Sequence, residues 1–179
     1  GYYSLASSIN TMWVFVLAAI IDSIYPTIMG LYKTDKKAFE RKNRQLYAIV
    51  FYVSFFVALL FVLFGKQAIL ILYGEKYVEA TAPLRIITWY TIFSYLGVAR
   101  NAWIVCENKQ RYLKYMYLGA AIINVGLNYI MIPIWGASGA AFASLITQIM
   151  TCMILPIFIS DMRPNVKLMI DAFLLRGIK

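Results

Sequence analysis

Histidine is absent from this 179-residue chain, cysteine occurs only twice, and charged residues make up only 14% of the sequence. Without histidine, the usual zinc, haem and histidine-dependent catalytic sites have no basis here. Cys106 and Cys152 lack the CxxC spacing of redox and metal motifs, so we assign both to packing and expect no disulfide framework. Paired carboxylates, nucleophile–base sets and phosphate-binding glycine loops are missing as well. We therefore expect a protein that is not an enzyme and that binds no cofactor or metal.

Hydrophobic residues dominate the chain instead, at 62% of the sequence, against roughly 45–50% in soluble domains. Several apolar stretches are long enough to cross a hydrocarbon core of ~30 Å as helices, and none shows the strict alternation of a membrane barrel. The expected fold class is therefore all-α, a polytopic helical membrane protein. Five transmembrane helices are predicted, at residues 3–31, 46–64, 84–105, 113–133 and 136–160, and the second could continue to residue 73.

Positive charge is concentrated in alternate connections between these spans. The loop KTDKKAFERKNR (residues 33–44), the turn ENKQRYLK (107–114) and the tail after Ser160 are all basic. The positive-inside rule then places these segments in the cytoplasm, with Gly1 outside and Lys179 inside. Because topology accounts for the net charge of +9, we expect contact with anionic membrane lipids and no nucleic acid. The chain begins with glycine, so we also expect it to be a fragment of a longer protein.

The tail, residues 161–179, has its own apolar face. The residues on this face follow helical spacing: Val166, Met169, Ile170, Phe173 and Leu174. Two interpretations stay open, an amphipathic helix lying on the cytoplasmic leaflet and the start of a further span.

Polar side chains inside the predicted spans are the main clues to function, because hydrocarbon penalises them. Asp22 lies in the first span, one turn before Pro26, and Arg100 lies near the cytoplasmic end of the third. At similar depths, the two could pair or line a common cavity. The alternatives are that Arg100 extends to the lipid headgroups and that Asp22 stabilises a helix loosened by proline.

Two asparagines mark the fourth span. Asn124 and Asn128 are four residues apart and so share a helix face, where they would either bond to a neighbouring helix or line a cavity. The segment PIWGASG (133–139) predicts a tight turn to the fifth span, which carries small residues at four-residue spacing. We therefore expect the last two spans to form a hairpin packed through small residues.

Four segments, taken in order, carry a resemblance to a known family: GYYSLASSI, IYPTIMG, ILILYGEKYVEATAPLRIIT and NVGLNYIMIPIWGASGAAFASLIT. In these segments, and so over residues 1 to about 160, the chain resembles the C-terminal half of bacterial polysaccharide flippases of the O-antigen and capsule type. These flippases belong to the multidrug/oligosaccharidyl-lipid/polysaccharide exporter superfamily, whose members have two six-helix lobes around a central cavity. The resemblance implies most of a C-lobe in a bacterial cytoplasmic membrane, with the N-terminal lobe as a partner that this chain lacks.

The resemblance also implies a function, which is movement of undecaprenyl-pyrophosphate-linked oligosaccharide from the inner to the outer leaflet by alternating access. Arg100 would then contact phosphate or acidic sugar, and Asp22, Asn124 and Asn128 would be secondary cavity or ion-coupling residues, with H⁺ and Na⁺ both open as coupling ions. Polysaccharide polymerases and glycosyltransferases are expected as partners. Two alternatives stay open: a cation-coupled multidrug exporter of the same superfamily, which needs acidic residues gathered in a cavity, and a non-transporting membrane scaffold, which needs a closed bundle without a polar groove.

Overall fold

The computed structural model describes residues 1–178, and this part of the chain is almost entirely helical, without a β-strand. The helical elements, in chain order, are α1 (Tyr2–Thr34), α2 (Lys36–Tyr73), η1 (Glu75–Ala80), α3 (Thr81–Ala99), α4 (Asn101–Cys106), α5 (Arg111–Ile149), η2 (Met150–Ile154), α6 (Leu155–Phe158), η3 (Ser160–Met162) and α7 (Arg163–Phe173). The elements η1 and η3 are 3₁₀-helices, and η2 is a turn of π-helix. The all-α prediction is confirmed for the described residues.

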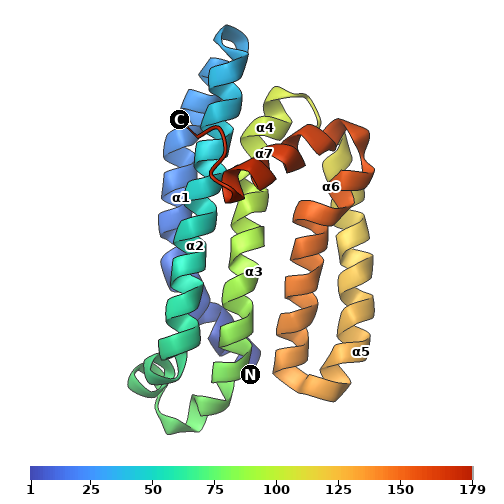
Figure 1. Cartoon of the computed structure of the whole chain (residues 1–179). Helices are drawn as coiled ribbons and strands as arrows, with labels where there is room; N and C mark the ends of the chain where they lie inside the picture. Colours follow the sequence, from blue (N-terminus) through green and yellow to red (C-terminus); the bar gives the residue numbers. More distant parts are fainter. Residues whose placement is uncertain (179) are drawn as a thin grey trace.

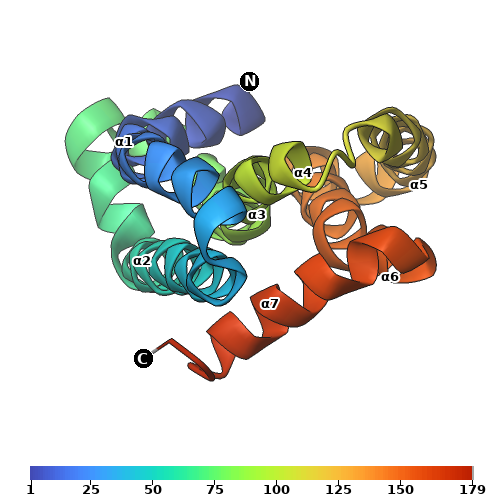
Figure 2. The ribbon, with the colours of Figure 1, turned by 90° about the horizontal axis from the view of Figure 1, so that it is seen from above.

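Helix α3 occupies the centre of the bundle. It packs against α1 and α2 on one side and against α5 on the other, so it separates the first two helices from the last two rods in the view from above (Figure 2). Figure 1 shows α1, α2 and α3 running roughly parallel to the two rods of α5, with α7 lying across one end of the bundle. The side chain of Asn10 in α1 donates a 2.6 Å hydrogen bond to the buried hydroxyl of Thr91 in α3, which fixes the two helices side by side.

Three helical stretches among the described residues are long and apolar enough to cross a bilayer: α1, α2 and the segment Arg111–Phe158. The third stretch is not one rod. At Gly136 the backbone has φ 53° and ψ −126°, and the chain reverses there into two antiparallel arms (Figure 1). Glycine adopts such positive φ values without the steric penalty that a Cβ brings. The predicted hairpin is therefore present.

The connection between α1 and α2 corrects the sequence prediction. Residues 33–44 were expected to form a basic loop, but a single residue, Asp35, separates the two helices. Asp35 has an extended backbone, and its carboxylate accepts a 3.0 Å hydrogen bond from the Ala38 N–H, which is the geometry of an N-cap. The lysine, arginine and glutamate residues that follow favour helix, so the basic segment forms the first turns of α2.

The predicted third span, residues 84–105, is also different. It is interrupted at Arg100, where α3 ends and α4 begins. The N–H of Arg100 still donates to the carbonyl of Leu96, and that of Ile104 donates to the carbonyl of Arg100, so the axis continues through the break.

The amphipathic helix predicted in the tail is present as α7. Its apolar face is partly shifted from the predicted one: Val166 and Met169 are buried as expected, but Leu168 and Ala172 join them, while Ile170 and Leu174 are exposed. The buried face packs on α2 and α6. Contact with the bundle, which the spacing alone does not reveal, selects this face.

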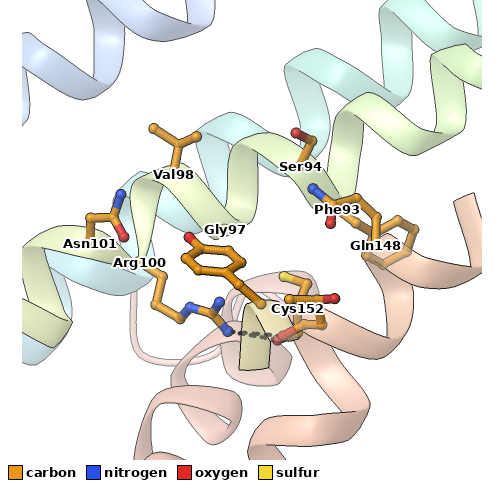
Figure 3. Close-up of a pocket in the computed structure, with 10 residues that line it drawn as sticks. Phe93, Ser94, Gly97, Val98, Arg100, Asn101, Gln148 and Cys152 are labelled. Carbon is orange, nitrogen blue, oxygen red and sulfur yellow. Dashed lines mark hydrogen bonds between the residues drawn. The ribbon is translucent and has the colours of Figure 1, made fainter. Parts of the chain in front are cut away.

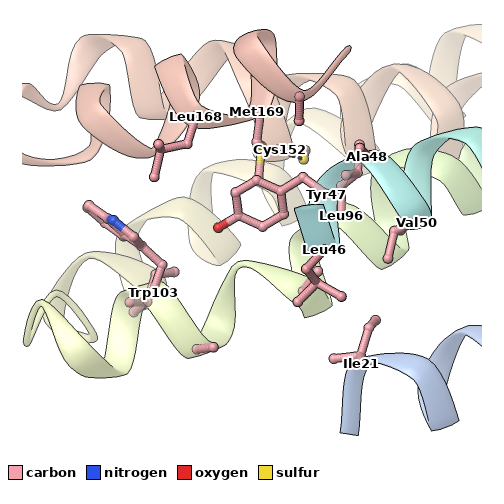
Figure 4. Packing of buried hydrophobic residues seen from close by; sticks show 14 of the residues in the cluster. Ile21, Leu46, Tyr47, Ala48, Val50, Leu96, Trp103, Cys152, Leu168 and Met169 are labelled. Carbon is pink, nitrogen blue, oxygen red and sulfur yellow. Dashed lines mark hydrogen bonds between the residues drawn. The ribbon is translucent and has the colours of Figure 1, made fainter. Parts of the chain in front are cut away.

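The main core lies where α2, α3, α4 and α7 meet (Figure 4). The Tyr47 ring is fully buried there beside Met169 and Leu96. Its hydroxyl accepts a 2.7 Å hydrogen bond from the buried Asn165 side chain, and so ties α7 to α2. This junction also holds the carboxyl-terminal end of the hairpin, because Cys152 of η2 belongs to the same cluster.

Candidate functional site

Arg100 is buried between α3 and the end of the α5 hairpin, with only 2% of its surface exposed. Its Nη1 atom donates to two backbone carbonyl oxygens, those of Thr151 at 3.4 Å and Cys152 at 3.2 Å. The close-up in Figure 3 shows the guanidinium pointing toward the η2 backbone beside Cys152. The alternative in which Arg100 extends to the lipid headgroups is therefore wrong, because the side chain points into the protein.

The acceptors of Arg100 lie in a turn of π-helix. In a π-turn the backbone N–H bonds to the carbonyl five residues earlier in the chain, where an α-helix uses the carbonyl four residues earlier. Such turns occur often at functional sites. Here the turn brings two carbonyl oxygens close enough to share one Nη1 donor. The Nε atom of Arg100 is also buried, and it has no hydrogen-bond partner among the described residues.

No carboxylate neutralises Arg100 within residues 1–178, because the ion pairs of this part of the chain all involve other residues. Carbonyl dipoles stabilise a guanidinium less well than an anion does, and a buried charge without a counterion is costly. An isolated buried cation of this kind is a candidate for binding an anion.

A hollow of about 200 Å³ opens beside Arg100, between α3 and both arms of α5 (Figure 3). Its lining is mostly polar or aromatic and includes no acidic residue: Phe93, Ser94, Gly97, Val98, Arg100, Asn101, Tyr117, Gln148, Thr151 and Cys152. We call this hollow the Arg100 pocket. The pocket offers the guanidinium of Arg100, two side-chain amides and three hydroxyl groups, those of Ser94, Thr151 and Tyr117. These groups are suited to an anionic, hydroxyl-rich ligand.

Asn124 and Asn128 do not line the Arg100 pocket. Asn128 donates to the Asn124 side-chain oxygen over 2.8 Å, and Asn124 donates over 3.2 Å to the hydroxyl of Thr147 in the opposite arm. The bond between helices that one interpretation expected is thus present. Thr151, one turn beyond Thr147, donates to the Thr147 carbonyl, so a polar track runs along the hairpin to the edge of the Arg100 pocket.

Asp22 is not part of this arrangement. Its side chain is exposed on α1, it forms no ion pair in the described chain, and it is absent from the lining of the Arg100 pocket. The hypothesis that Asp22 and Arg100 pair or share a cavity is therefore wrong for this structure. Similar depth in two predicted spans does not place two side chains on facing surfaces, and here Asp22 is exposed on α1 whereas Arg100 is buried.

Sequence reasoning missed several residues of the pocket. Gln148 and Asn101 both line it, and Thr151 contributes both its carbonyl and its place in the lining. Gln148 carried a usable signal, since it is an amide inside a predicted span. Asn101 was not singled out, because the prediction treated residues 84–105 as one uninterrupted helix and did not expect the break at Arg100.

Charged residues gather at the end of the bundle that α7 crosses. Lys36 pairs with Glu107, and the Asp161 carboxylate accepts from Lys109 Nζ at 2.9 Å and from the Tyr112 hydroxyl at 2.7 Å. The hydrogen bond from Lys109, followed by that from Tyr112, lowers the pKa of Asp161 from 3.8 to about 2. These contacts join η3 to the turn before α5. No three histidine, cysteine or acidic residues of the described chain are grouped as a metal site would require.

Comparison with known proteins gives one match. A family model described as "Polysaccharide biosynthesis protein" matches residues 1–82, which include α1 and α2. Searches of curated proteins and of solved structures found no match. The family match supports a general role in polysaccharide biosynthesis, and the long apolar helices are compatible with a membrane protein.

Proposed function

We propose that this chain is the larger part of the C-lobe of a flippase that carries undecaprenyl-pyrophosphate-linked oligosaccharide across the bacterial cytoplasmic membrane. The observation that carries the proposal is the buried Arg100, which has no acidic partner and faces a polar pocket. The match to a polysaccharide biosynthesis family supports the choice of substrate class.

The physical task explains why a buried cation is useful. A diphosphate-sugar head loses its hydration in hydrocarbon at a prohibitive cost, whereas the apolar polyprenyl tail is soluble in hydrocarbon. A protein that offers the head a polar cavity with a positive group, and leaves the tail in lipid, lowers that barrier. Alternation of the cavity between the two leaflets then moves the head without covalent chemistry.

The proposed membrane topology has five spans. These are α1, α2, α3 with α4, and the two arms of α5 with its continuation to Phe158. Helix α3 has 19 residues, which at ~1.5 Å per residue approaches the ~30 Å of the hydrocarbon core. The basic end of the bundle would face the cytoplasm, with Gly1 outside, and a second lobe would complete the cavity.

Two features support a flippase over the alternatives. A cation-coupled drug exporter needs carboxylates gathered in its cavity, whereas the Arg100 pocket has none and Asp22 lies outside it. A scaffold needs a closed bundle, whereas a polar pocket opens here between α3 and α5. Coupling to H⁺ or Na⁺, and contacts with a polymerase and glycosyltransferases, belong to the proposal as expectations.

The test is the fate of the lipid-linked oligosaccharide in cells that lack the gene. A flippase predicts that the intermediate accumulates in the inner leaflet, inaccessible to a membrane-impermeant sugar-modifying reagent, and that the intact gene restores its access. A drug exporter predicts normal access with altered drug sensitivity. A scaffold predicts that access is restored by supplying the other assembly members in excess, and either of these results would refute the proposal.

A further inference from the structure

One stripe of α2 changes from basic to apolar over a few residues. Its first turns carry Lys37, Arg41 and Arg44, and Gln45 marks the change. The apolar continuation is formed by Ala48, Ile49, Tyr52 and Val53. Steps of three and four residues place these positions on one helix face. The stripe is therefore basic at its N-terminal end and apolar along the rest of its length.

The C-terminal segment after α7 forms a second wall beside this stripe. Two side chains of α2 hold its backbone: Arg44 Nε donates to the Gly177 carbonyl at 3.1 Å, and Gln45 donates to the Ile178 carbonyl at 2.9 Å. A third, Tyr52, donates to the carbonyl of Phe173 at the end of α7 over 2.9 Å. Figure 2 shows that α7 ends near α2 and that the C-terminal segment continues from the end of α7. The wall is therefore fixed by specific contacts.

Two hollows follow one another between these walls. The first, of about 440 Å³, is lined by Asp35, Lys37, Ala38, Glu40, Arg41, Arg44 and Gly177. The second, of about 540 Å³, is lined by Gln45, Ala48, Ile49, Tyr52, Val53, Leu175 and Ile178. Arg44 and Gly177 of the first hollow are the chain neighbours of Gln45 and Ile178 of the second, so the polar hollow is followed directly along α2 by the apolar groove.

The polar hollow favours a negative group. Lys37, Arg41 and Arg44 form no ion pair within residues 1–178, and these three cations outnumber the two carboxylates of the hollow, Asp35 and Glu40. The Asp35 carboxylate is already bound to the Ala38 N–H. The hollow also lies at the N-terminal end of α2, where the helix dipole is positive. Arg44 uses Nε for the Gly177 carbonyl, which leaves the two terminal nitrogens of its guanidinium to face a ligand.

We propose that these two hollows form a binding site for an anionic phospholipid. The headgroup phosphate lies among Lys37, Arg41 and Arg44, and one acyl chain follows the groove past Ile49 and Val53. A soluble anion would leave the groove empty, and a neutral lipid would leave the cations unmatched. The site is separate from the Arg100 pocket and does not depend on what that pocket carries.

Native mass spectrometry of the full chain in detergent, titrated with phosphatidylglycerol or with phosphatidylcholine of the same acyl chains, tests the headgroup contact. Arg41 is the residue to change, because it lines the hollow but makes no hydrogen bond to the C-terminal segment. Arg41→Gln is expected to weaken phosphatidylglycerol binding roughly fivefold, which is the effect of about one basic residue at a lipid surface. Lys42→Gln is the matched control, since it removes the same charge one residue away, off the stripe.

Ile49→Trp tests the groove. It places an indole where the acyl chain is proposed, on a face that is already 39% exposed, so the fold should tolerate it. It is expected to weaken long-chain phosphatidylglycerol but not glycerol phosphate. Equal losses in Arg41→Gln and Lys42→Gln would indicate diffuse attraction and overturn the proposal, as would unchanged long-chain binding in Ile49→Trp or equal affinity for the two headgroups.

Discussion

The Nη1 atom of Arg100 lies 3.2 Å from the carbonyl oxygen of Cys152, and this contact joins the α3–α4 junction to the π-turn at the end of the hairpin. The guanidinium therefore has two roles. It holds two segments that are far apart in the sequence, and it lines a pocket without a counterion. Any substitution of Arg100 must be tested for stability as well as for function.

The hairpin should depend on the absence of a side chain at Gly139. A Cβ there would lie 2.6 Å from the carbonyl carbon of Met131, which is backbone and cannot rotate away. Gly139→Ala is expected to lower the free energy of unfolding by about 1–3 kcal/mol, as overpacking does. Denaturant or thermal unfolding in detergent measures the change.

Gly126→Ala is the control for this prediction, because nothing lies within 4 Å of a Cβ at Gly126, which is in the other arm of the same hairpin. It should be neutral or slightly stabilising, since alanine favours helix over glycine. Equal stability of the two variants would show that the arms do not approach as closely as the structure has them.

The Tyr47 hydroxyl should contribute to the link between α7 and α2. Tyr47→Phe leaves the fully buried Asn165 amide without the partner it reaches at 2.7 Å. Losing the partner of a buried donor costs about 1–3 kcal/mol, and we expect a loss of stability in that range. Hydrogen exchange across α7 should also increase, because this contact fixes the helix.

Tyr52→Phe gives the comparison in the same helix. Its hydroxyl donates to the Phe173 carbonyl from a side chain that is 41% exposed, so no fully buried group loses its partner and the cost should be about 0.5 kcal/mol, the low end for a hydrogen bond. A Tyr47→Phe variant no less stable than Tyr52→Phe would contradict the account of the core.

The contacts of Asp161 should respond to acid. Its pKa is lowered to about 2 in the folded chain, so ionised Asp161 contributes stability that is complete well above its ordinary pKa of 3.8. That contribution falls as the pH drops below 3.8 and is lost once the pH passes about 2. Hydrogen exchange in residues 107–112 and 160–163 should increase over this pH window.

Asp161→Asn removes the titrating group and keeps an oxygen acceptor for Lys109 and Tyr112. The variant should show weaker protection at neutral pH and a smaller change between pH 4 and 2 than the wild-type chain, most clearly in residues 160–163, because Glu107, which pairs with Lys36, remains in the other segment. A wild-type chain whose protection there is flat across the same range would refute the prediction.

Much of the fold could be predicted from the sequence, because apolar length and turn chemistry are local. The hairpin follows from Pro133, Gly136 and the small residues around Gly139, and the structure confirms it. The prediction of a loop at residues 33–44 was wrong because the charged residues there were taken as a sign of a loop. Lysine, arginine and glutamate are in fact good helix formers, and α2 begins at Lys36. The tail helix was found, but its buried face depends on what α7 contacts.

The site was harder to predict than the fold. Arg100 was singled out because charge in a predicted span is rare, and the structure places it in the lining of a pocket. Asp22 was grouped with it on depth alone, and depth says nothing about which way a side chain points around its helix. Gln148 and Asn101 reach the pocket only through the packing of α3 against both arms, a relationship between residues about 50 apart that periodicity does not contain.

Transfer of lipid-linked oligosaccharide between leaflets by the intact protein with Arg100→Gln is the most direct test of the central claim. Arg85→Gln, which removes an exposed arginine from the same helix, is the control, and transfer is normalised to folded protein in the membrane. We expect Arg100→Gln to slow transfer roughly tenfold or more, as loss of a charge-assisted contact would, with partial recovery in Arg100→Lys. Transfer by Arg100→Gln at the rate of Arg85→Gln would contradict the account.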